Sequence, residues 1–351
     1  MKILSIDTSC DETAAAITEN TNILSNIVWS QASAHAKFGG VMPSLAQRMH
    51  EERIDWVIES AIQRAKIKVE ELDAIAVTIG PGLSIALGVG IDRARKLSIK
   101  YNKKLIAVNH LEGHLLSPFA NDKLQMIYFK FPALGLVVSG GNTLLVKINK
   151  IGSYETLAQT TDDALGEALD KSARMLGLGY PGGAILEKFA HSAISGRITR
   201  GVNLKSYTLP IPIVGQEGRK IFTYSGLKTA MSRLVQSEKP LTKEKIYNLA
   251  ACFQDVAFTH LVRVVSRQIQ DSGFGIHGLL VGGGVSANIE LRKRLRKMGR
   301  KYGMRVAFPY SKKLTGDNAA MIGVAAFFKT QRGEFIETDK IDRNPNAKIT
   351  D

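Results

Sequence analysis

Cysteine is scarce in this sequence, and long apolar segments are missing. The only two cysteines, Cys10 and Cys252, are far apart in a chain of 351 residues. A disulfide framework is therefore not expected, and a reducing cytoplasm is the predicted compartment. No uninterrupted apolar run reaches the roughly 18 residues that cross a membrane. No signal peptide precedes the first apolar strand, which begins at Lys2, so we expect no membrane association.

Acidic residues are too few to balance the basic ones. The chain has 47 Lys and Arg against 32 Asp and Glu, a formal net charge of +15. Two interpretations stay open: a solvated basic surface, or a surface for an anionic partner such as nucleic acid. The charge is densest at 290–305, where apolar residues at helical spacing predict an amphipathic helix with a basic outer face. Three cations there share one side and are candidate RNA contacts: Arg292, Arg296 and Arg300.

The two halves of the chain repeat one pattern. Residues 2–30 and 133–160 both read as strand, small polar turn, strand, turn, strand. Residues 72–97 and 276–295 both read as buried strand, glycine-rich turn and helix. Glycine turns before a helix let backbone N–H groups approach an anion. The duplication predicts two similar α/β lobes around a cleft.

The remaining segments complete this expected domain plan. Helical periodicity predicts long helices at 43–65 and 241–269. We assign residues 1–117, completed by a helix at 317–332, to the first lobe and residues 118–316 to the second. The polar tail, 333–351, is expected to be only partly ordered.

The stretch "NHLEGH" places His110 and His114 four residues apart, on one face of a helix. A zinc protease needs a glutamate directly after the first histidine. Glu112 stands one place later and would point away from both rings, so the protease interpretation lacks its general base. The metal interpretation survives beside the alternative of ordinary core or surface histidines. We expect surface-facing ligands here, whose replacement removes the ion without disturbing the core.

Asp317, in "LTGDNAAMIG", is a candidate third metal ligand. An equally simple interpretation makes it the N-cap of the helix that follows. Two histidines and one carboxylate leave coordination positions open, which suits iron(II) and also zinc.

Glycine-rich turns and nearby acids are the other candidates for a binding site. The turns at 137–143 and 281–288 offer N–H groups to a phosphate or carboxylate, or are simply tight turns. Asp170 and Glu187, near Gly183, are carboxylates that suit ribose hydroxyls, or else solvated helix acids. "DTSCDET" crowds three acids into one turn, which suggests a nearby cation or a donor-rich ligand. Cys10 in that turn reads as a buried structural thiol.

These motifs together resemble the TsaD family of tRNA threonylcarbamoyladenosine enzymes, which includes the Kae and Qri proteins. The matching stretches are "DTSCDET", "FGGVMPSLAQRMH", "GPGL", "NHLEGH", "SGGNT", "DDALGEALDKSARMLGLGYPGG", "YSGLKTA", "GGGVSAN" and "TGDNAAMIG", in order from Lys2 to about Phe328. The resemblance implies an actin, sugar kinase and Hsp70-like (ASKHA) fold. It implies an acyltransferase that moves threonylcarbamoyl from threonylcarbamoyl-AMP to N6 of the adenosine following the anticodon, in tRNAs reading codons that begin with A.

The resemblance also implies site residues and partners. It makes His110, His114 and Asp317 ligands of one divalent metal ion, Fe²⁺ first and Zn²⁺ second, and implicates Asp11 in catalysis. It assigns a nucleotide and substrate site to Val137, Val138, Ser139, Gly140, Gly141, Asp170, Gly183, Glu187 and Asn288. The implied partners are tRNA, a TsaB-like paralogous subunit and a TsaE-like ATPase. Asn142 departs from the histidine usual in bacterial members, which puts the partner set in question; a homodimer is the alternative.

Two other functions remain open at this level. One is an ATPase or kinase of the same fold, which would not need the His–His–Asp group. The other is a noncatalytic tRNA-binding scaffold, which would not need the acids.

Overall fold

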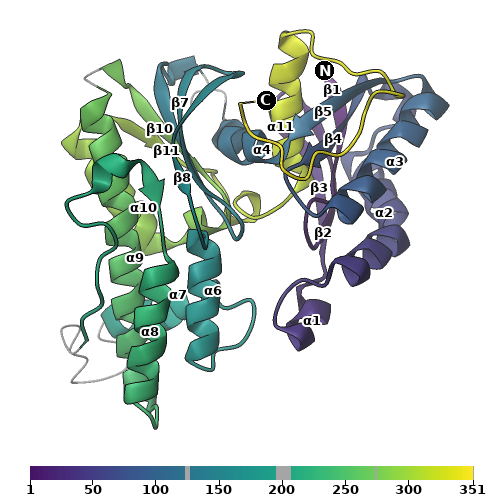
Figure 1. Ribbon diagram of the computed structural model, residues 1–351. Helices are drawn as coiled ribbons and strands as arrows, with labels where there is room; N and C mark the ends of the chain where they lie inside the picture. Colours follow the sequence, from purple (N-terminus) through teal and green to yellow (C-terminus); the bar gives the residue numbers. More distant parts are fainter. Residues whose placement is uncertain (123–126, 195–206, 273–274, 351) are drawn as a thin grey trace.

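Two β-sheets, each with its own helices, form the molecule (Figure 1). The computed structural model describes residues 1–122, 127–194, 207–272 and 275–350. The first sheet has strand order β3-β2-β1-β4-β5. Its strands are β1 (Lys2–Asp7), β2 (Glu12–Glu19), β3 (Asn22–Ser30), β4 (Ala74–Gly80) and β5 (Lys104–Asn109). β1 pairs antiparallel with β2 and parallel with β4, so a hairpin lies beside a parallel ladder.

The second sheet repeats this topology. Its order is β11-β10-β6-β7-β8-β9, in which β6 pairs antiparallel with β7 and parallel with β10. Its strands are β6 (Ala133–Val138), β7 (Thr143–Lys150), β8 (Ser153–Thr160), β9 (Ile221–Phe222), β10 (Gly278–Gly282) and β11 (Arg305–Ala307). The prediction of two similar α/β lobes is therefore confirmed, because both halves build a hairpin followed by parallel strands.

Helices cover both sheets and fill the space between them. They are α1 (Ala32–His35), α2 (Pro43–Ala65), α3 (Ser84–Tyr101), α4 (His110–Leu116), α6 (Leu165–Met175), α7 (Gly183–Ile194), α8 (Ser225–Ser237), α9 (Lys243–Asp271), α10 (Ile289–Lys301) and α11 (Ala319–Gln331). α2 and α3 pack on the first sheet, whereas α6 to α10 belong to the core of the second. α4 and α11 lie between the sheets and contact each other (Figure 1).

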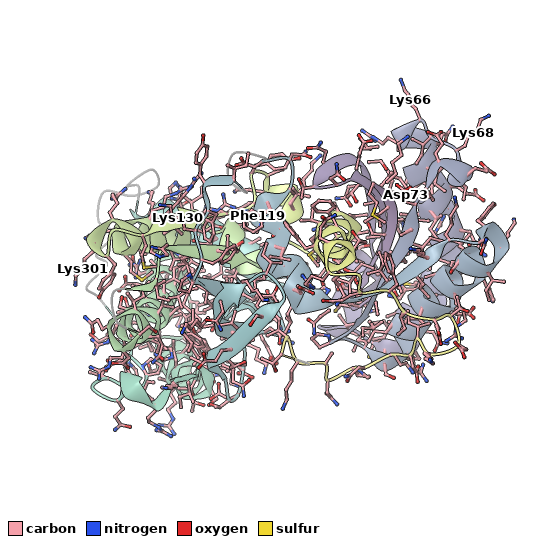
Figure 2. The ribbon with its side chains drawn as sticks, turned by 90° about the horizontal axis from the view of Figure 1, so that it is seen from above. Lys66, Lys68, Asp73, Phe119, Lys130 and Lys301 are labelled. Carbon is pink, nitrogen blue, oxygen red and sulfur yellow. The ribbon has the colours of Figure 1, made fainter. Side chains whose placement is uncertain are left out.

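One apolar core joins the two halves through α4 and α11. It contains Val108 from the first sheet, Leu280 from the second, and Leu115 and Met321 from the two helices. Phe119, near the middle of Figure 2, packs its ring edge-on against Phe129 and Phe328 in the same region. Burial of these side chains at roughly 25 cal/mol per Å² of apolar area holds the lobes together without a covalent link beyond the chain.

α9 alone among the described helices is long and apolar enough to cross a membrane. Its most apolar window is 72% buried inside the protein, where it packs against α7 and α8. Burial explains the apolar sequence, because a core helix meets the same test as a membrane span.

The C-terminal tail is packed rather than loosely attached, contrary to the expectation from its polarity. Ile336 bridges Leu105 at the edge of the first sheet, and Ile341 and Ile349 are buried. Figure 1 shows the tail in yellow, crossing the first lobe and ending between the lobes. The few apolar residues in this segment supply its anchors.

Candidate metal centre and its cavities

Helix α4 carries both histidines and lies between the two sheets. β5 ends at Asn109, whose side-chain oxygen accepts hydrogen bonds from the N–H groups of Leu111 and Glu112 and so caps the helix. From this start, His110 and His114 fall one turn apart, with ring centroids 4.6 Å from each other. The second sheet presses on the same helix: a Cβ at Gly282 would lie only 2.0 Å from the carbonyl oxygen of His114. Only glycine, which has no Cβ, lets β10 approach α4 this closely at position 282.

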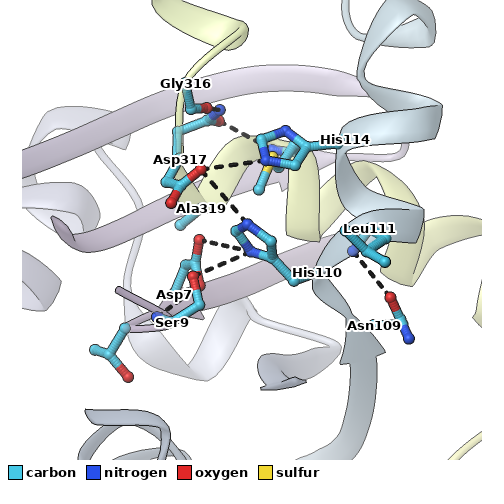
Figure 3. Close-up of polar contacts among 12 residues, drawn as sticks. Asp7, Ser9, Asn109, His110, Leu111, His114, Gly316, Asp317 and Ala319 are labelled. Atoms are coloured by element: carbon cyan, nitrogen blue, oxygen red, sulfur yellow. Dashed lines mark hydrogen bonds and ion pairs between the residues drawn. The ribbon is translucent and has the colours of Figure 1, made fainter. Parts of the chain in front are cut away.

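Asp317 reaches the histidines because a neighbour caps α11. Asn318 is the N-cap, and its side-chain oxygen accepts from the N–H of Met321. The N-cap interpretation of Asp317 is therefore wrong. Its carboxylate Oδ1 lies 3.2 Å from Nε2 of His114 and 3.5 Å from Nε2 of His110 (Figure 3). One ligand atom from each of the three residues falls within 4.8 Å of the others.

The histidines are buried, so the expectation that they face the surface is also wrong. His110 is 6% exposed and His114 is 0% exposed, because α4 lies between the sheets. Neither ring nitrogen of His114 has a hydrogen-bond partner with acceptable geometry. A buried imidazole without partners is costly, and a metal ion bound to Nε2 would lower that cost.

Electrostatics in the cluster favour a bound cation. Burial alone would lower the pKa of His110, but the carboxylates of Asp317 and Asp7 outweigh it and raise that pKa to about 10. Burial also opposes ionisation of Asp317, yet the adjacent His110 and His114 hold its pKa well below the usual range. Burial lowers the pKa of His114. The cluster thus holds a positive charge between carboxylates, in a position where a divalent ion could replace the proton.

Two residues behind His110 fix its ring. Oγ of Ser9 lies 3.1 Å from Nδ1 of His110, and Oδ2 of Asp7 lies 3.5 Å from the same nitrogen (Figure 3). These contacts occupy Nδ1 and leave Nε2 for a metal, the usual arrangement around a ligating histidine. The sequence interpretation missed this role; the acid-rich turn after β1 was the available signal.

Glu112 points away from the metal candidates, as the helical spacing predicted. It is buried, and the Tyr154 hydroxyl on β8 donates a 2.8 Å hydrogen bond to its Oε1. The guanidinium of Arg332, after α11, lies 3.6 Å from the same oxygen. Glu112 therefore anchors the back of α4 to the second sheet and cannot act as the base of a zinc protease.

His110 and Asp317 line a cavity of about 590 Å³, here called the metal cavity, whereas the fully buried His114 lies behind them and does not line it. Its walls include Asp11 from the first lobe and the Ser139–Asn142 turn from the second. Burial raises the pKa of Glu12 to about 9, and the nearby Asp317 and Asp11 add to the shift. Glu12 thus keeps its proton at neutral pH, which lowers the repulsion that three adjacent acids would otherwise produce.

A second cavity of about 270 Å³, the glycine cavity, continues from the metal cavity. Both are lined by Gly140 and Asp170, and the glycine cavity is also lined by Gly183, Glu187 and Asn288. The structure therefore brings the predicted nucleotide-site residues of α6, α7 and α10 together at one place.

Several of these residues already carry structural bonds. Oδ1 of Asp170 accepts from the N–H groups of Gly182 and Gly183, at 2.9 and 2.6 Å, so this carboxylate holds the turn before α7. Glu187 accepts from the N–H of Ile289, and Asn288 is the N-cap of α10. The solvated-acid interpretation of Asp170 does not fit, because one oxygen is committed to the turn and the residue lines both cavities.

Val137 and Val138 are placed differently. Both are fully buried in β6 and line neither the metal cavity nor the glycine cavity. They carry the backbone into the Ser139–Asn142 turn, so any contact with a ligand would be indirect.

A comparison with known families and proteins agrees with the geometry. The model of the TsaD family, described as tRNA N6-adenosine threonylcarbamoyltransferase, matches residues 22–324. A protein of that name from Chelativorans sp. is 42% identical over 95% of this chain and 90% of its own length. Another, from Thermodesulfovibrio yellowstonii, is 43% identical over 95% of this chain and 96% of its own length.

Solved structures support the fold alone. Component A of (R)-2-hydroxyglutaryl-CoA dehydratase from Acidaminococcus fermentans superposes with a TM-score of 0.54 at 14% identity, covering 94% of this chain and 99% of that one. The activator of the 2-hydroxyisocaproyl-CoA dehydratase from Clostridium difficile gives 0.53 at 15% identity, covering 95% and 97%. These neighbours are of the ASKHA type, so the predicted fold class is confirmed.

Proposed function

The chain belongs to the TsaD family of tRNA N6-adenosine threonylcarbamoyltransferases, and from this premise we propose how its cleft performs the reaction. The donor is threonylcarbamoyl-AMP, and the acceptor is N6 of adenosine 37, next to the anticodon, in tRNAs that read codons beginning with A. The observation that carries the proposal is the meeting of His110, His114 and Asp317, two of which, His110 and Asp317, line a cavity that glycine turns also line.

The AMP part of the donor binds in the glycine cavity. We place the adenosine between Gly183 and Asn288, with its ribose hydroxyls donating to Glu187 or to Asp170, both of which line this cavity. The phosphate then lies at Gly140, where the cavity opens into the metal cavity. Backbone N–H groups at this turn can hold the phosphate of the departing AMP.

The carbamoyl group lies in the metal cavity. His110 and His114 through Nε2, and Asp317 through Oδ1, would hold one divalent metal ion, which we propose to be Fe²⁺, with Zn²⁺ as the alternative. When bound, the ion supplies Lewis-acid polarisation of a carbonyl oxygen. Asp7 and Ser9 keep His110 in the tautomer that presents Nε2 to it.

Transfer is a nucleophilic substitution at the carbamoyl carbon. The lone pair of N6 forms the new C–N bond, the bond from that carbon to the phosphate oxygen breaks, and AMP leaves with the electron pair. N6 must lose a proton, and Asp11, 8% exposed in the cavity wall, is the carboxylate placed to accept it. A kinase of this fold would need none of these metal ligands.

tRNA meets the basic surface of α10. Leu291, Leu295 and Met298 are buried, which turns Lys293, Lys297 and Arg300 outward. Arg292 is held instead: its Nε donates to the carbonyl of Ser286, and its guanidinium lies over Phe308. Arg296 is exposed, although its guanidinium also lies over Phe308. We propose that Arg296, Arg300 and the outward lysines contact phosphates, and that Arg292, the remaining member of the predicted set, contributes least.

Subunit partners remain part of the proposal. α2 exposes Trp56 by 52%, and the segment before it exposes Phe38 and Met42, which suits the docking of a TsaB-like subunit. A TsaE-like ATPase would complete the assembly; a homodimer is the alternative. The free thiols Cys10 and Cys252 suit a cytoplasmic enzyme.

We assign 1–117 with 317–332 to one lobe and 118–316 to the other.

The test is incubation of the protein with threonylcarbamoyl-AMP and unmodified tRNA, followed by nucleoside analysis. Threonylcarbamoyladenosine at position 37 is the expected product. An Asp11→Asn variant should give none while binding both substrates. Formation of no modified nucleoside by the wild-type protein, alone and with the two partner proteins, would overturn the proposal.

A further inference from the structure

A third hollow, about 440 Å³ in volume, lies between the lobes beside the metal cavity and is here called the tail groove. One wall is the end of the C-terminal tail, Pro345 to Ile349, and the other comes from β8 and the turn before β7. Its volume is within the roughly 300–1,000 Å³ usual for ligand sites. Neither the metal ligands nor the proposed AMP site uses it.

The tail wall is built into the fold. The N–H of Asn344 donates to the carbonyl of Ile79 at 2.7 Å, and the side-chain amide of Asn109 donates to the carbonyl of Lys348 at 2.9 Å. A Cβ at Gly80, whose φ is +150°, would lie 1.8 Å from the carbonyl oxygen of Asn344. The sequence therefore keeps glycine where the tail crosses the end of β4.

The three hollows form a row. The glycine cavity and the metal cavity share Gly140 and Asp170, whereas the metal cavity and the tail groove share Pro81, Gly82 and Gly141, along with Asn142. The metal cavity is thus the middle member. In group transfer, donor and acceptor must reach one reacting centre from different sides. When AMP occupies the glycine cavity, the acceptor can still approach the metal cavity from the tail groove.

The chemistry of the groove fits an RNA nucleoside. The metal cavity contains four carboxylates, but no acidic side chain lines the groove in the described part of the chain. A phosphate backbone would therefore meet less repulsion at the groove than at the metal cavity. Amide side chains from Asn142, Gln159 and Asn346 can donate hydrogen bonds to ring nitrogens of an adenine, which leaves its N6 amine free to react.

We propose that the tail groove receives the acceptor adenosine of tRNA, splayed out of its loop, and passes its N6 through the Pro81–Asn142 neck to the metal cavity. This inference rests on the proposed function, because it assumes that AMP occupies the glycine cavity. It adds the location of the second substrate and a role for the C-terminal tail. Gln159 and Thr156 on β8, both exposed, become determinants of acceptor binding rather than of donor binding.

The test measures binding, so that it is independent of turnover. Two fluorescent anticodon stem-loop RNAs are titrated into the protein, one with adenosine and one with an abasic site at the acceptor position. The wild-type protein should prefer the adenosine loop by about tenfold, the expectation for one good base contact. Gln159→Ala and Thr156→Ala should each reduce that preference to about threefold or less. Glu155→Ala, on the same strand but outside the groove, should keep it.

Donor binding and metal content complete the design. Both groove variants should bind a non-hydrolysable donor analogue and retain metal as the wild-type protein does. Loss of donor affinity in them would instead place the threonyl end of the donor in the groove and overturn the inference. An undiminished preference for the adenosine loop in both variants would also overturn the inference, as would the absence of that preference in the wild-type protein. The nucleoside analysis distinguishes these outcomes from a failure of the proposed function. In each of them the wild-type protein would still transfer the threonylcarbamoyl group to tRNA.

Discussion

Replacement of one buried histidine should lower the stability of the apo protein and should also abolish the stabilisation that metal binding provides. His114→Ala deletes an imidazole that is 0% exposed between the two sheets. Truncating a large buried side chain leaves a cavity and costs about 2–5 kcal/mol, and removal of the two unpartnered ring nitrogens offsets part of this cost, so we expect an apo variant about 1–3 kcal/mol less stable than the apo wild type. The variant should still fold, because His114 does not belong to the apolar core between the lobes, which keeps all its members. The expectation that the fold stays intact is kept, but its stated reason, that the ligands face the surface, does not hold for the buried His114.

The metal contributes a separate and measurable increment. An ion present at 100 times its dissociation constant stabilises a folded protein by about 2.7 kcal/mol. A chelator should therefore lower the thermal unfolding midpoint of the wild-type protein by several degrees. The unfolding midpoint of His114→Ala should not respond to chelator. The two ligands that remain should not retain the ion, so the chelator has no bound metal to remove.

The assay is thermal unfolding with and without chelator, paired with elemental analysis of each purified protein. His191→Ala serves as the matched control, because His191 is an exposed histidine on α7 and is outside the metal cavity. This control should hold metal and respond to chelator as the wild type does. Equal metal content in His114→Ala and wild type would refute the assignment of the ligand, and an unresponsive wild type would refute the metal centre.

Three further predictions address the donor site, pH and the RNA surface. Asp170→Ala should weaken binding of a donor analogue by about 1–3 kcal/mol in calorimetry, since a charged acceptor is lost; unchanged affinity would place Asp170 outside the site. Burial lowers the pKa of His260 to about 4, so the unfolded chain alone takes up its proton as pH falls from 6.5 towards 4. Stability should fall by up to about 3 kcal/mol over that window, and His260→Gln should show a shallower fall; identical slopes would contradict this. Lys297→Gln, at an exposed position of α10, should flatten the log–log salt dependence of tRNA binding by about 0.7 to 0.9. Lys66→Gln, on the other lobe (Figure 2), should leave the slope unchanged. Equal slopes in wild type and Lys297→Gln would place the RNA elsewhere.

Local pattern determined the elements of the fold. Alternation of apolar residues and glycine-rich turns predicted both hairpins and both strand–turn–helix units, and the structure forms them in the same order. These features depend on neighbours within a few residues, which the sequence displays directly. The orientation of Glu112 was predictable for the same reason, because helical spacing alone turns it away from His110 and His114.

Long-range contacts decided what the local pattern left open. The sequence allowed Asp317 to be either a helix cap or a metal ligand, and only the presence of Asn318 as the actual cap, with α4 opposite, brings its carboxylate to the histidines. Asp170 was open to two interpretations, a ribose ligand or a solvated acid, and the structure shows that its Oδ1 holds the turn at Gly183, 13 positions along the chain. Distances between residues more than a hundred positions apart are not encoded in any one segment, and they depend on how the sheets pack.

The burial of polar residues was the property that the sequence pattern predicted least accurately. His114 looked surface-facing because a polar helix face usually meets water, yet the approach of the second sheet encloses it. The tail looked loose because it is polar, yet Ile341 and Ile349 anchor it along the first lobe. Whether a polar segment is solvated depends on what covers it, so the tail groove became visible only when the tail, β8 and the glycine turns were placed together in three dimensions.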